Sequence, residues 1–433
     1  MKTYTYNQLK TDDLRQLCQR PKMDFQSVFG QVQPIIKKVE QKGDSGINYY
    51  SQKFDGVVPD PLVINPQQKK VSLDPEIRQA IDTAFDNICR FHKAQLRKPL
   101  KVETMPGVQC KRVTRPIERV GLYVPGGTAI LPSTLMMLGI PAMLAGCSTI
   151  VIATPPKTDG TIADEILYIA QKVGATHLLK AGGAQAVSGM ALGTESVPKV
   201  DKILGPGNQY VTAAKMMLQN SEAQIAIDMP AGPSEVLIIA DKSANPKYVA
   251  ADLLSQAEHG EDSQVVLIAT PDFDLETCEQ EINHQLADLP RQKVAKKAIE
   301  QSFVLTVDTL EQAFSFSNQY APEHLILQCN NPEKWEKNII NAGSVFLGPW
   351  TPESAGDYAS GTNHTLPTYG YARMFSGVSV DSFLKQITMQ QITKEGLQNV
   401  GPTVEKLAQL EHLQAHKNAV SIRLNDINSE SNT

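Results

Sequence analysis

The stretch GLYVPGGTAILPSTLMMLGIPAMLAGCSTIVIATPP, residues 121–156, decides the fold class. Gly121–Pro125 has the apolar character of a short buried strand, and Ser148–Pro156 predicts a second strand rich in β-branched residues. Between them, Pro132–Gly146 has the length and composition of a helix. A strand, a glycine-rich turn, a helix and another strand together predict a parallel β-α-β unit.

The alternation of strands and helices continues towards the C-terminus. Helices are expected at 162–173, 184–192 and 210–218, each after a short strand. A second series then repeats the order. Its expected strands are 235–241, 264–270, 303–307, 325–327 and 344–347. The sequence therefore predicts an α/β protein with two doubly wound, incomplete Rossmann-like parallel-sheet domains.

Four parts are expected along the chain. They are an N-terminal helical segment at 1–25, a first and discontinuous α/β domain at 26–117 and 234–375, a second α/β domain at 118–233 with the glycine-rich turns, and a C-terminal helical domain at 376–433. The mostly helical pattern ends near residue 115, a second series of strands begins at Glu235, and short helices return from Ser376 onward.

Composition excludes several classes of protein. The chain has 433 residues, of which 41% are hydrophobic and 20% charged, and its formal net charge is −5. We expect no binding to nucleic acid, because the basic patch that such proteins carry is missing. The first residues lack an apolar segment behind basic ones, and prolines and glycines interrupt the apolar stretch 129–154. A cytoplasmic protein with no membrane-spanning segment is expected.

The six cysteines are scattered and form no CxxC pair. This spacing argues against a zinc site made of thiolates and against a disulfide framework in a chain of this length. Free thiols in a reducing compartment are therefore expected. For the same reason a metal site, if there is one, must use nitrogen and oxygen donors.

Two glycine-rich turns follow predicted strands and lead into predicted helices. They are VPGGTAILPST at 124–134 and LGPGNQYV at 204–211. In parallel sheets such turns bind phosphates and dinucleotides, since free backbone amides and the positive end of the helix point outward there. Neither turn is GxGxxG, so the turns alone do not identify a dinucleotide site.

Four segments pair a histidine with a carboxylate or carboxamide. The residues concerned are Gln256 and His259, Glu323 and His324, Asp357 and His364, and Glu411 with His412 and His416. Imidazole and carboxylate are the donors that zinc accepts when cysteine is excluded. Spacing alone leaves the choice of ligands open, because Asp252, Glu258 and the His412/His416 pair are candidates as good as Gln256.

Several longer segments, in this order along the chain, resemble the histidinol dehydrogenase family. They are VPGGTAILPSTLMMLGIPA, AGGAQAVSGMALGTESVPKVDKILGPGN, DMPAGPSEVLIIAD, LLSQAEHGEDSQ, NQYAPEHL, AGSVFLG, GDYASGTNHTLPT and AHKNAV. The resemblance spans about 25–425. It implies an aldehyde-dehydrogenase-like arrangement of the two sheet domains and the four-electron oxidation of L-histidinol through L-histidinaldehyde to L-histidine. It also implies NAD, one Zn²⁺ per subunit, and a homodimer in which the C-terminal domain completes the partner's site.

The resemblance also implies roles for particular residues. The implied zinc ligands are Gln256, His259, Asp357 and His416, and the implied catalytic pair is Glu323 and His324. The implied substrate contacts are Ser234, Gln256, His259, His324, Asp357, Glu411 and His416. The implied NAD contacts are Tyr123, Gln185 and Asn208. His177, His364 and His412 receive no role.

Three other functions compete with this one. A relative with the same fold could oxidise a different small alcohol or diol. An aldehyde dehydrogenase with a cysteine nucleophile is disfavoured, because none of the six cysteines lies in a loop suited to catalysis. A binding protein without catalytic activity is disfavoured by the presence of every zinc and base position.

Overall fold

The computed structural model describes residues 1–20, 25–126, 130–229 and 232–430. It divides into two compact units. They are Met1–Gln95 with Ile117–Phe383, and Leu96–Pro116 with Leu384–Thr433.

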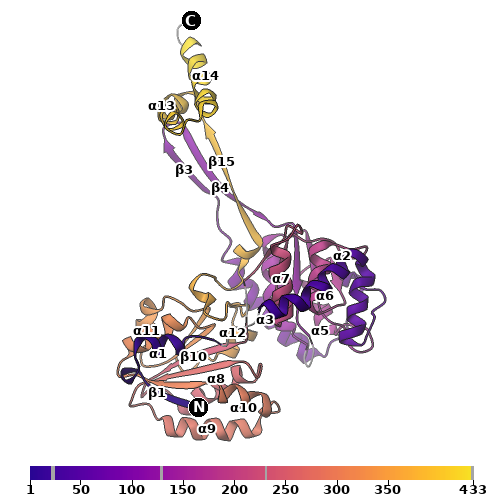
Figure 1. Cartoon of the computed structure of the whole chain (residues 1–433), viewed down its shortest axis with the longest axis vertical. Helices are drawn as coiled ribbons and strands as arrows, with labels where there is room; N and C mark the ends of the chain where they lie inside the picture. Colours follow the sequence, from indigo (N-terminus) through magenta and orange to yellow (C-terminus); the bar gives the residue numbers. More distant parts are fainter. Residues whose placement is uncertain (21–24, 127–129, 230–231, 431–433) are drawn as a thin grey trace. The chain divides into compact units, whose positions relative to one another are not determined.

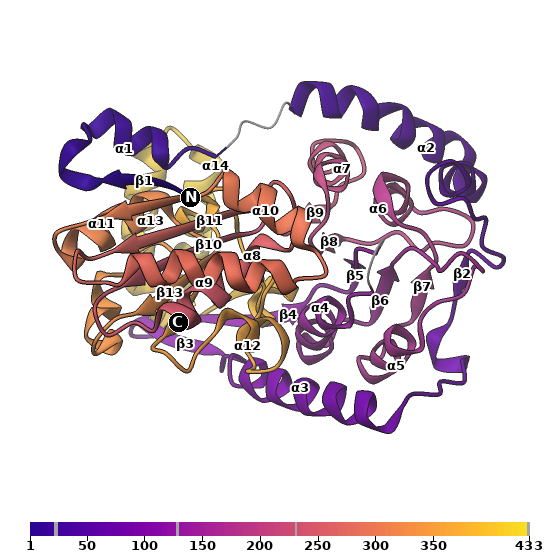
Figure 2. The ribbon, with the colours of Figure 1, turned by 90° about the horizontal axis from the view of Figure 1, so that it is seen from below.

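The first unit contains two six-stranded sheets, of which the first is entirely parallel (Figures 1 and 2). Its strands are β1 (Lys2–Thr5), β10 (Glu235–Ala240), β11 (Gln264–Ala269), β12 (Phe303–Thr306), β13 (His324–Gln328) and β14 (Ser344–Leu347). They lie in the order β1-β12-β11-β10-β13-β14, and each pairs with its neighbours in parallel. The strands of the second predicted series are thus confirmed.

Helices cover both faces of the first sheet. The bounds are α1 (Thr11–Leu17), α8 (Pro246–Ala257), α9 (Leu275–Asp288), α10 (Gln292–Glu300), α11 (Leu310–Tyr320) and α12 (Glu353–Tyr358). Val236 and Ile238 pack with α8, α9 and α10, whereas Leu237 and Ile239 pack with α1 and α11. Successive residues of a strand point to opposite faces, so a strand buried on both sides must be apolar throughout.

The second sheet is built in the same way, apart from one antiparallel edge strand. Its strands are β2 (Val63–Ile64), β5 (Arg119–Tyr123), β6 (Thr149–Ala153), β7 (His177–Leu179), β8 (Lys202–Leu204) and β9 (Ala226–Ile227). The order is β2-β7-β6-β5-β8-β9, and only the β2–β7 pair runs antiparallel. The β-α-β unit predicted at 121–156 is therefore confirmed as β5, α4 and β6.

Three helices pack on each face of the second sheet (Figure 2). They are α2 (Phe25–Asp55), α6 (Gly183–Leu192) and α7 (Gln209–Gln219) on one face, and α3 (Pro75–Lys93), α4 (Pro132–Ala145) and α5 (Asp164–Lys172) on the other. Ten residues of α4 are buried, from Ser133 to Ala142. Within the described ranges, no helix has both the length and the apolar character needed to cross a membrane.

The domain boundaries differ from those drawn on the sequence. Residues 26–95 were expected on the first sheet, but α2, β2 and α3 lie on the second, because Val32, Val39 and Ile47 of α2 join the core of α6 and α7. Hydrophobic period predicts that a helix is amphipathic without indicating which sheet it covers. The N-terminal segment is not only helical, since β1 adds an edge strand to the first sheet.

The second unit is a three-stranded antiparallel sheet with two helices (Figure 1). Its elements are β3 (Leu100–Met105), β4 (Val108–Pro116), β15 (Leu384–Ile392), α13 (Lys394–Leu410) and α14 (Gln414–Glu430). Strand β4 lies in the middle and pairs with both others. The C-terminal helices were predicted, but the sheet was not. A further difference is that the 3-10 helix at Val380–Phe383 belongs to the first unit.

The buried side chain of His92 makes the stability of the fold depend on pH. His92 at the end of α3 is fully buried, with Nδ1 3.0 Å from the Ile88 carbonyl oxygen and Nε2 3.3 Å from the Asn363 amide nitrogen. Burial lowers the pKa of His92 below its usual 6.5. The unfolded chain therefore binds a proton that the folded chain excludes, and stability falls as pH drops below about 6.5.

We expect His92→Gln to lose less stability than the unsubstituted protein between pH 7 and pH 5. Urea unfolding at both pH values measures the difference. His284→Gln, at an exposed histidine, is the matched control and should keep the original pH dependence. An unchanged pH dependence in His92→Gln would show that other groups cause it.

Candidate functional site

Helix α8 presents the first two predicted ligands at its C-terminal end. The helix ends at Ala257, so Gln256 lies in its last turn and His259 just beyond it. Gln256 is buried and His259 is exposed. The Nδ1 of His259 lies 3.1 Å from the Ser255 carbonyl oxygen, which fixes the proton on that nitrogen. The lone pair of His259 Nε2 is thereby left available for a metal ion.

Glu323 and His324 occupy the junction between α11 and β13. Ala321 ends α11 in a left-handed conformation with φ 53°, and Pro322 follows. His324 is the first residue of β13, while Glu323 precedes the strand. Both side chains are buried and line the same cavity. A regular strand would send adjacent side chains to opposite faces, so the irregular start is what brings them together.

The first residue of β10 holds this pair. The backbone N–H of Glu235 donates to Glu323 Oε2 at 2.8 Å. The Nδ1 of His324 lies 3.1 Å from the Glu235 carbonyl oxygen and 2.7 Å from the Gln256 amide nitrogen. His324 Nε2 lies 3.3 Å from Asp357 Oδ1. The imidazole is therefore fixed on both sides.

Asp357 comes from the short helix α12, and the loop after it returns to the same place. The Nδ1 of His364 lies 2.8 Å from the Asp357 carbonyl oxygen, and its Nε2 lies 3.4 Å from Thr134 Oγ1. The family resemblance implies no role for His364, yet the structure places it in the wall of the cavity. Its place beside Asp357 in one short segment of the sequence had already made it a candidate.

These residues enclose a cavity of about 220 Å³. It is lined by Pro125, Leu131, Ser133, Thr134, Pro206, Ser234, Gln256, His259, Glu323, His324, Asp357, Tyr358 and His364. Every predicted site residue of the first unit, apart from the NAD contacts, is among them. Asp252 and Glu258, which spacing alone could not exclude as ligands, are not.

Burial and crowding of carboxylates set the protonation of the site. Burial raises the pKa of Glu323 to about 8 and that of Glu353 to about 7. Burial alone would lower the pKa of His324, but the neighbouring carboxylates Glu323, Asp357 and Glu353 outweigh it and raise that pKa to about 10. A cation bound among these groups would favour the ionised carboxylates and the neutral imidazole.

Two oxygen atoms beside the cavity could act as metal ligands. Gln256 Oε1 is buried and makes no hydrogen bond, and the buried Asp357 Oδ1 faces the imidazole of His324, 3.3 Å from its Nε2. A buried polar atom that makes no hydrogen bond is costly unless something binds it. Within the described ranges, no three His, Cys, Asp or Glu side chains are arranged to hold a metal ion. Of the four predicted ligands, this unit supplies His259 and Asp357 of those types, with Gln256 as a carboxamide donor.

The predicted NAD contacts line a second pocket of about 600 Å³. Tyr123, Gln185 and Asn208 all face it, at the carboxyl ends of strands of the second sheet, where parallel sheets bind nucleotides. Gln185 Oε1 is buried without a partner. Asn208 caps α7, its side chain accepting the Tyr210 and Val211 amides at 3.1 Å each.

Close contacts hold the second glycine-rich turn next to Tyr123, which lines this pocket. Gly205 has φ 131°, and a Cβ there would lie 2.1 Å from the Tyr123 carbonyl oxygen. Buried Lys215 donates to Gly205 O at 2.9 Å, and Asp228 Oδ2 accepts from Gly205 N at 2.7 Å. In the first glycine-rich turn, residues 127–129 lie outside the described ranges.

Glu411 and His416 belong to the second unit. Glu411 ends α13, His416 lies in the first turn of α14, and both are exposed on that unit. Their predicted roles in the site of another subunit therefore stay predictions.

Comparison with known proteins gives one consistent result. The family model described as histidinol dehydrogenase matches residues 18–424. A chloroplastic histidinol dehydrogenase of Arabidopsis thaliana is 58% identical over 432 residues, which cover 99% of this chain and 93% of the relative. Histidinol dehydrogenase of Schizosaccharomyces pombe is 52% identical over 427 residues, with 97% of each chain covered. A crystal structure of histidinol dehydrogenase from Elizabethkingia anophelis aligns with a TM-score of 0.93 at 48% identity, covering 99% of both chains.

Proposed function

The chain belongs to the histidinol dehydrogenase family, and on this premise we propose that it oxidises L-histidinol through L-histidinaldehyde to L-histidine, with Zn²⁺ in the cavity and NAD as hydride acceptor. It is thus an oxidoreductase of the final steps of histidine biosynthesis. The observation that carries the proposal is the single cavity shared by three predicted metal ligands and the Glu323/His324 pair.

The residues present fit a zinc ion. Gln256 Oε1 is buried without a partner, Asp357 Oδ1 is a buried carboxylate oxygen beside His324 Nε2, and His259 keeps Nε2 free. We propose that these three atoms and His416 of a second subunit hold the ion, which makes two imidazoles, one carboxylate and one carboxamide. Bound there, zinc would anchor the amino and imidazole nitrogens of the substrate as a redox-silent Lewis acid.

The residues of the second pocket fit a dinucleotide. The pocket is several hundred Å³ in volume, lies beside a glycine-rich turn, and is lined by Gln185, whose buried Oε1 has no hydrogen-bond partner. NAD bound there would accept the hydride from substrate carbon.

His324 and Glu323 divide the proton transfers. An alcohol releases hydride readily only as its O–H proton leaves, so a base is required. A cation held at Asp357 would offset the carboxylates that raise the pKa of His324, and the neutral imidazole would then take that proton. The aldehyde must then gain water before a second hydride can leave. Glu323, whose raised pKa of about 8 suits proton transfer near neutral pH, activates that water. His324 takes the hydroxyl proton of the hydrated aldehyde in the second oxidation.

Dimerisation is proposed from the surface of the second unit. Large apolar side chains are exposed there on both the sheet and the helices. They are Leu100, Val102, Met105, Ile387, Met389, Ile392, Leu407, Leu410, Leu413 and Ile422. Apolar surface on this scale favours contact with another protein surface. A second copy of this chain would cover it and bring Glu411 and His416 to the partner's cavity.

The yield of NADH tests the proposed function. With L-histidinol limiting and NAD in excess, we expect about two NADH per histidinol, because each oxidation transfers one hydride. A yield of one would indicate a simple alcohol dehydrogenase. Turnover of other amino alcohols or diols in preference to histidinol would favour a relative with a different substrate.

We expect His416→Asn to weaken zinc binding by about tenfold or more, since even changes beyond the ligands cost about that much. Metal content after dialysis measures the effect. His412→Asn, four residues before it and also exposed, is the matched control and should retain its zinc. Equal zinc in both variants would exclude His416 as a ligand.

A further inference from the structure

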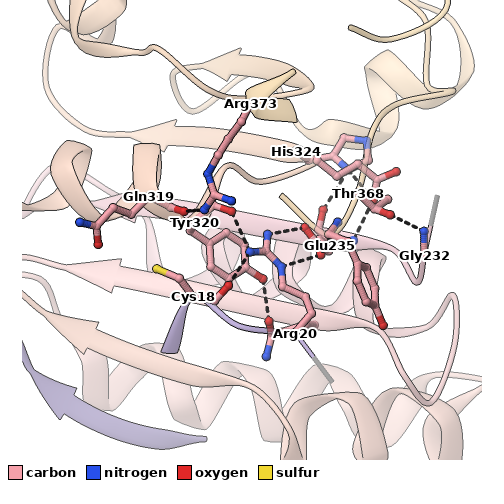
Figure 3. Close-up of polar contacts among 12 residues, drawn as sticks. Cys18, Arg20, Gly232, Glu235, Gln319, Tyr320, His324, Thr368 and Arg373 are labelled. Carbon is pink, nitrogen blue, oxygen red and sulfur yellow. Dashed lines mark hydrogen bonds and ion pairs between the residues drawn. The ribbon is translucent and has the colours of Figure 1, made fainter. Parts of the chain in front are cut away.

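A buried ion pair lies directly behind the catalytic pair and has no part in the mechanism above. It joins Arg20 to Glu235 (Figure 3). The side chains are only 4% and 1% exposed. Two parallel hydrogen bonds of 2.8 Å each connect Arg20 Nε and Nη2 to the two carboxylate oxygens of Glu235. This forked geometry fixes both position and orientation.

The rest of the Arg20 guanidinium is also fully engaged. Its Nη1 donates to the carbonyl oxygens of Cys18 at 2.8 Å and Tyr320 at 2.7 Å. The group also stacks on the Tyr320 ring, 3.5 Å from the ring centre. Tyr320 is the last residue of α11, three positions before Glu323. Arg20 therefore ties the N-terminal segment to the end of the helix that leads into the catalytic pair.

Glu235 connects Arg20 to the two catalytic side chains. Its carboxylate is held by Arg20 and by the Tyr369 amide, which donates to Oε1 at 3.0 Å. As the first residue of β10, Glu235 directs its N–H to the Glu323 side chain at 2.8 Å. Its carbonyl oxygen lies 3.1 Å from His324 Nδ1. The backbone of one residue thus contacts both catalytic side chains.

Stability alone does not explain such a pair. Replacing a buried ion pair by apolar groups of similar size is often neutral or stabilising, because desolvation offsets the attraction between the charges. What a forked pair adds is a single allowed orientation of the carboxylate. Here that orientation fixes the Glu235 backbone, whose N–H donates to the Glu323 carboxylate.

We propose that Arg20 is a positioning residue for the oxidation, acting through Glu235 to hold Glu323 and His324 in place. The inference rests on the proposed function. The two catalytic side chains depend on Glu235 unequally, because His324 is also fixed by Gln256 at 2.7 Å and Asp357 at 3.3 Å. Glu323 has Glu235 as its hydrogen-bond partner. Disturbing the pair should therefore impair hydration of the aldehyde more than oxidation of the alcohol.

Arg20→Lys tests this, since lysine keeps the charge but can neither fork nor stack. Pre-steady-state NADH formation is measured separately from histidinol and from histidinaldehyde. The expected result is a fall of about 10-fold to 100-fold in the aldehyde step, a smaller fall in the alcohol step, and an unchanged KM for NAD. The ratio of the two rates cancels any loss of folded protein, so a purely structural role would leave it constant.

Arg119→Lys is the matched control, because Arg119 makes a similar pair with Asp201 that is 47% and 39% exposed. It should leave both rates unchanged. If Arg20→Lys fails to fold, the neutral double variant Arg20→Met with Glu235→Gln should show the same drop in the ratio. A wild-type ratio in whichever variant folds would overturn the proposal. Failure of the proposed function is distinguishable, because the unsubstituted protein would then oxidise neither compound.

Discussion

Glu323→Gln should oxidise histidinol to the aldehyde at nearly the normal rate and then stop. The carboxamide oxygen can still accept the Glu235 N–H, so the loop and His324 should stay in place. What is lost is the base that activates water, which contributes about 10²-fold to 10⁴-fold in enzymes of this kind. Rapid-quench analysis should show histidinaldehyde accumulating on the enzyme, with about one NADH formed per site in the first phase.

Glu261→Gln is the control for this experiment. Glu261 is exposed, where its carboxylate pairs with Lys297, and it does not line the cavity. Both oxidations should proceed normally in that variant. Equal losses in the two steps of Glu323→Gln would refute the division of labour between Glu323 and His324.

Mixed dimers should recover activity that neither parent variant has. If His416 acts in the partner's cavity, a dimer of one Glu323→Gln subunit and one His416→Asn subunit contains one cavity with both lesions and one with none. Random exchange of subunits should then restore roughly a quarter of the unsubstituted activity, because about half of the dimers are mixed and each has one intact site.

The control is a mixture assayed under conditions that prevent subunit exchange, which should show no gain. Activity no higher than the sum of the parents after full exchange would place Glu323 and His416 in the same subunit's site. It would also remove the basis for assigning His416 to the cavity of the partner.

Local pattern was enough to predict the central strands of the two six-stranded sheets, but not the short strands β1, β2 and β9. Strands such as β10 and β11 are apolar throughout because both faces are covered, and this leaves a clear signal. The sheet of β3, β4 and β15 left none, since all six residues of β3 are exposed. Its pairing joins Val108 to Ile392, and such long-range register is not encoded in any short window of sequence.

The candidate site shows the same limit. Spacing along the sequence could not rank Gln256 above Asp252 as a ligand. In the fold only Gln256 lines the cavity, whereas Asp252 is buried and accepts a hydrogen bond of 3.3 Å from the Gln328 amide. The resemblance named the residues that meet in the cavity. The resemblance did not indicate the Arg20–Glu235 pair. A charged residue at the start of a strand, such as Glu235, is usually exposed, and Arg20 lies 215 positions before it in the sequence.

The location of the metal tests the account most directly. Anomalous diffraction at the zinc edge, on crystals of the zinc-loaded protein, should give one peak per subunit bounded by Gln256 Oε1, His259 Nε2 and Asp357 Oδ1, next to His324. A side chain of a second subunit, His416, should complete the coordination. A peak elsewhere, or a fully active protein with no zinc in this cavity, would contradict the account.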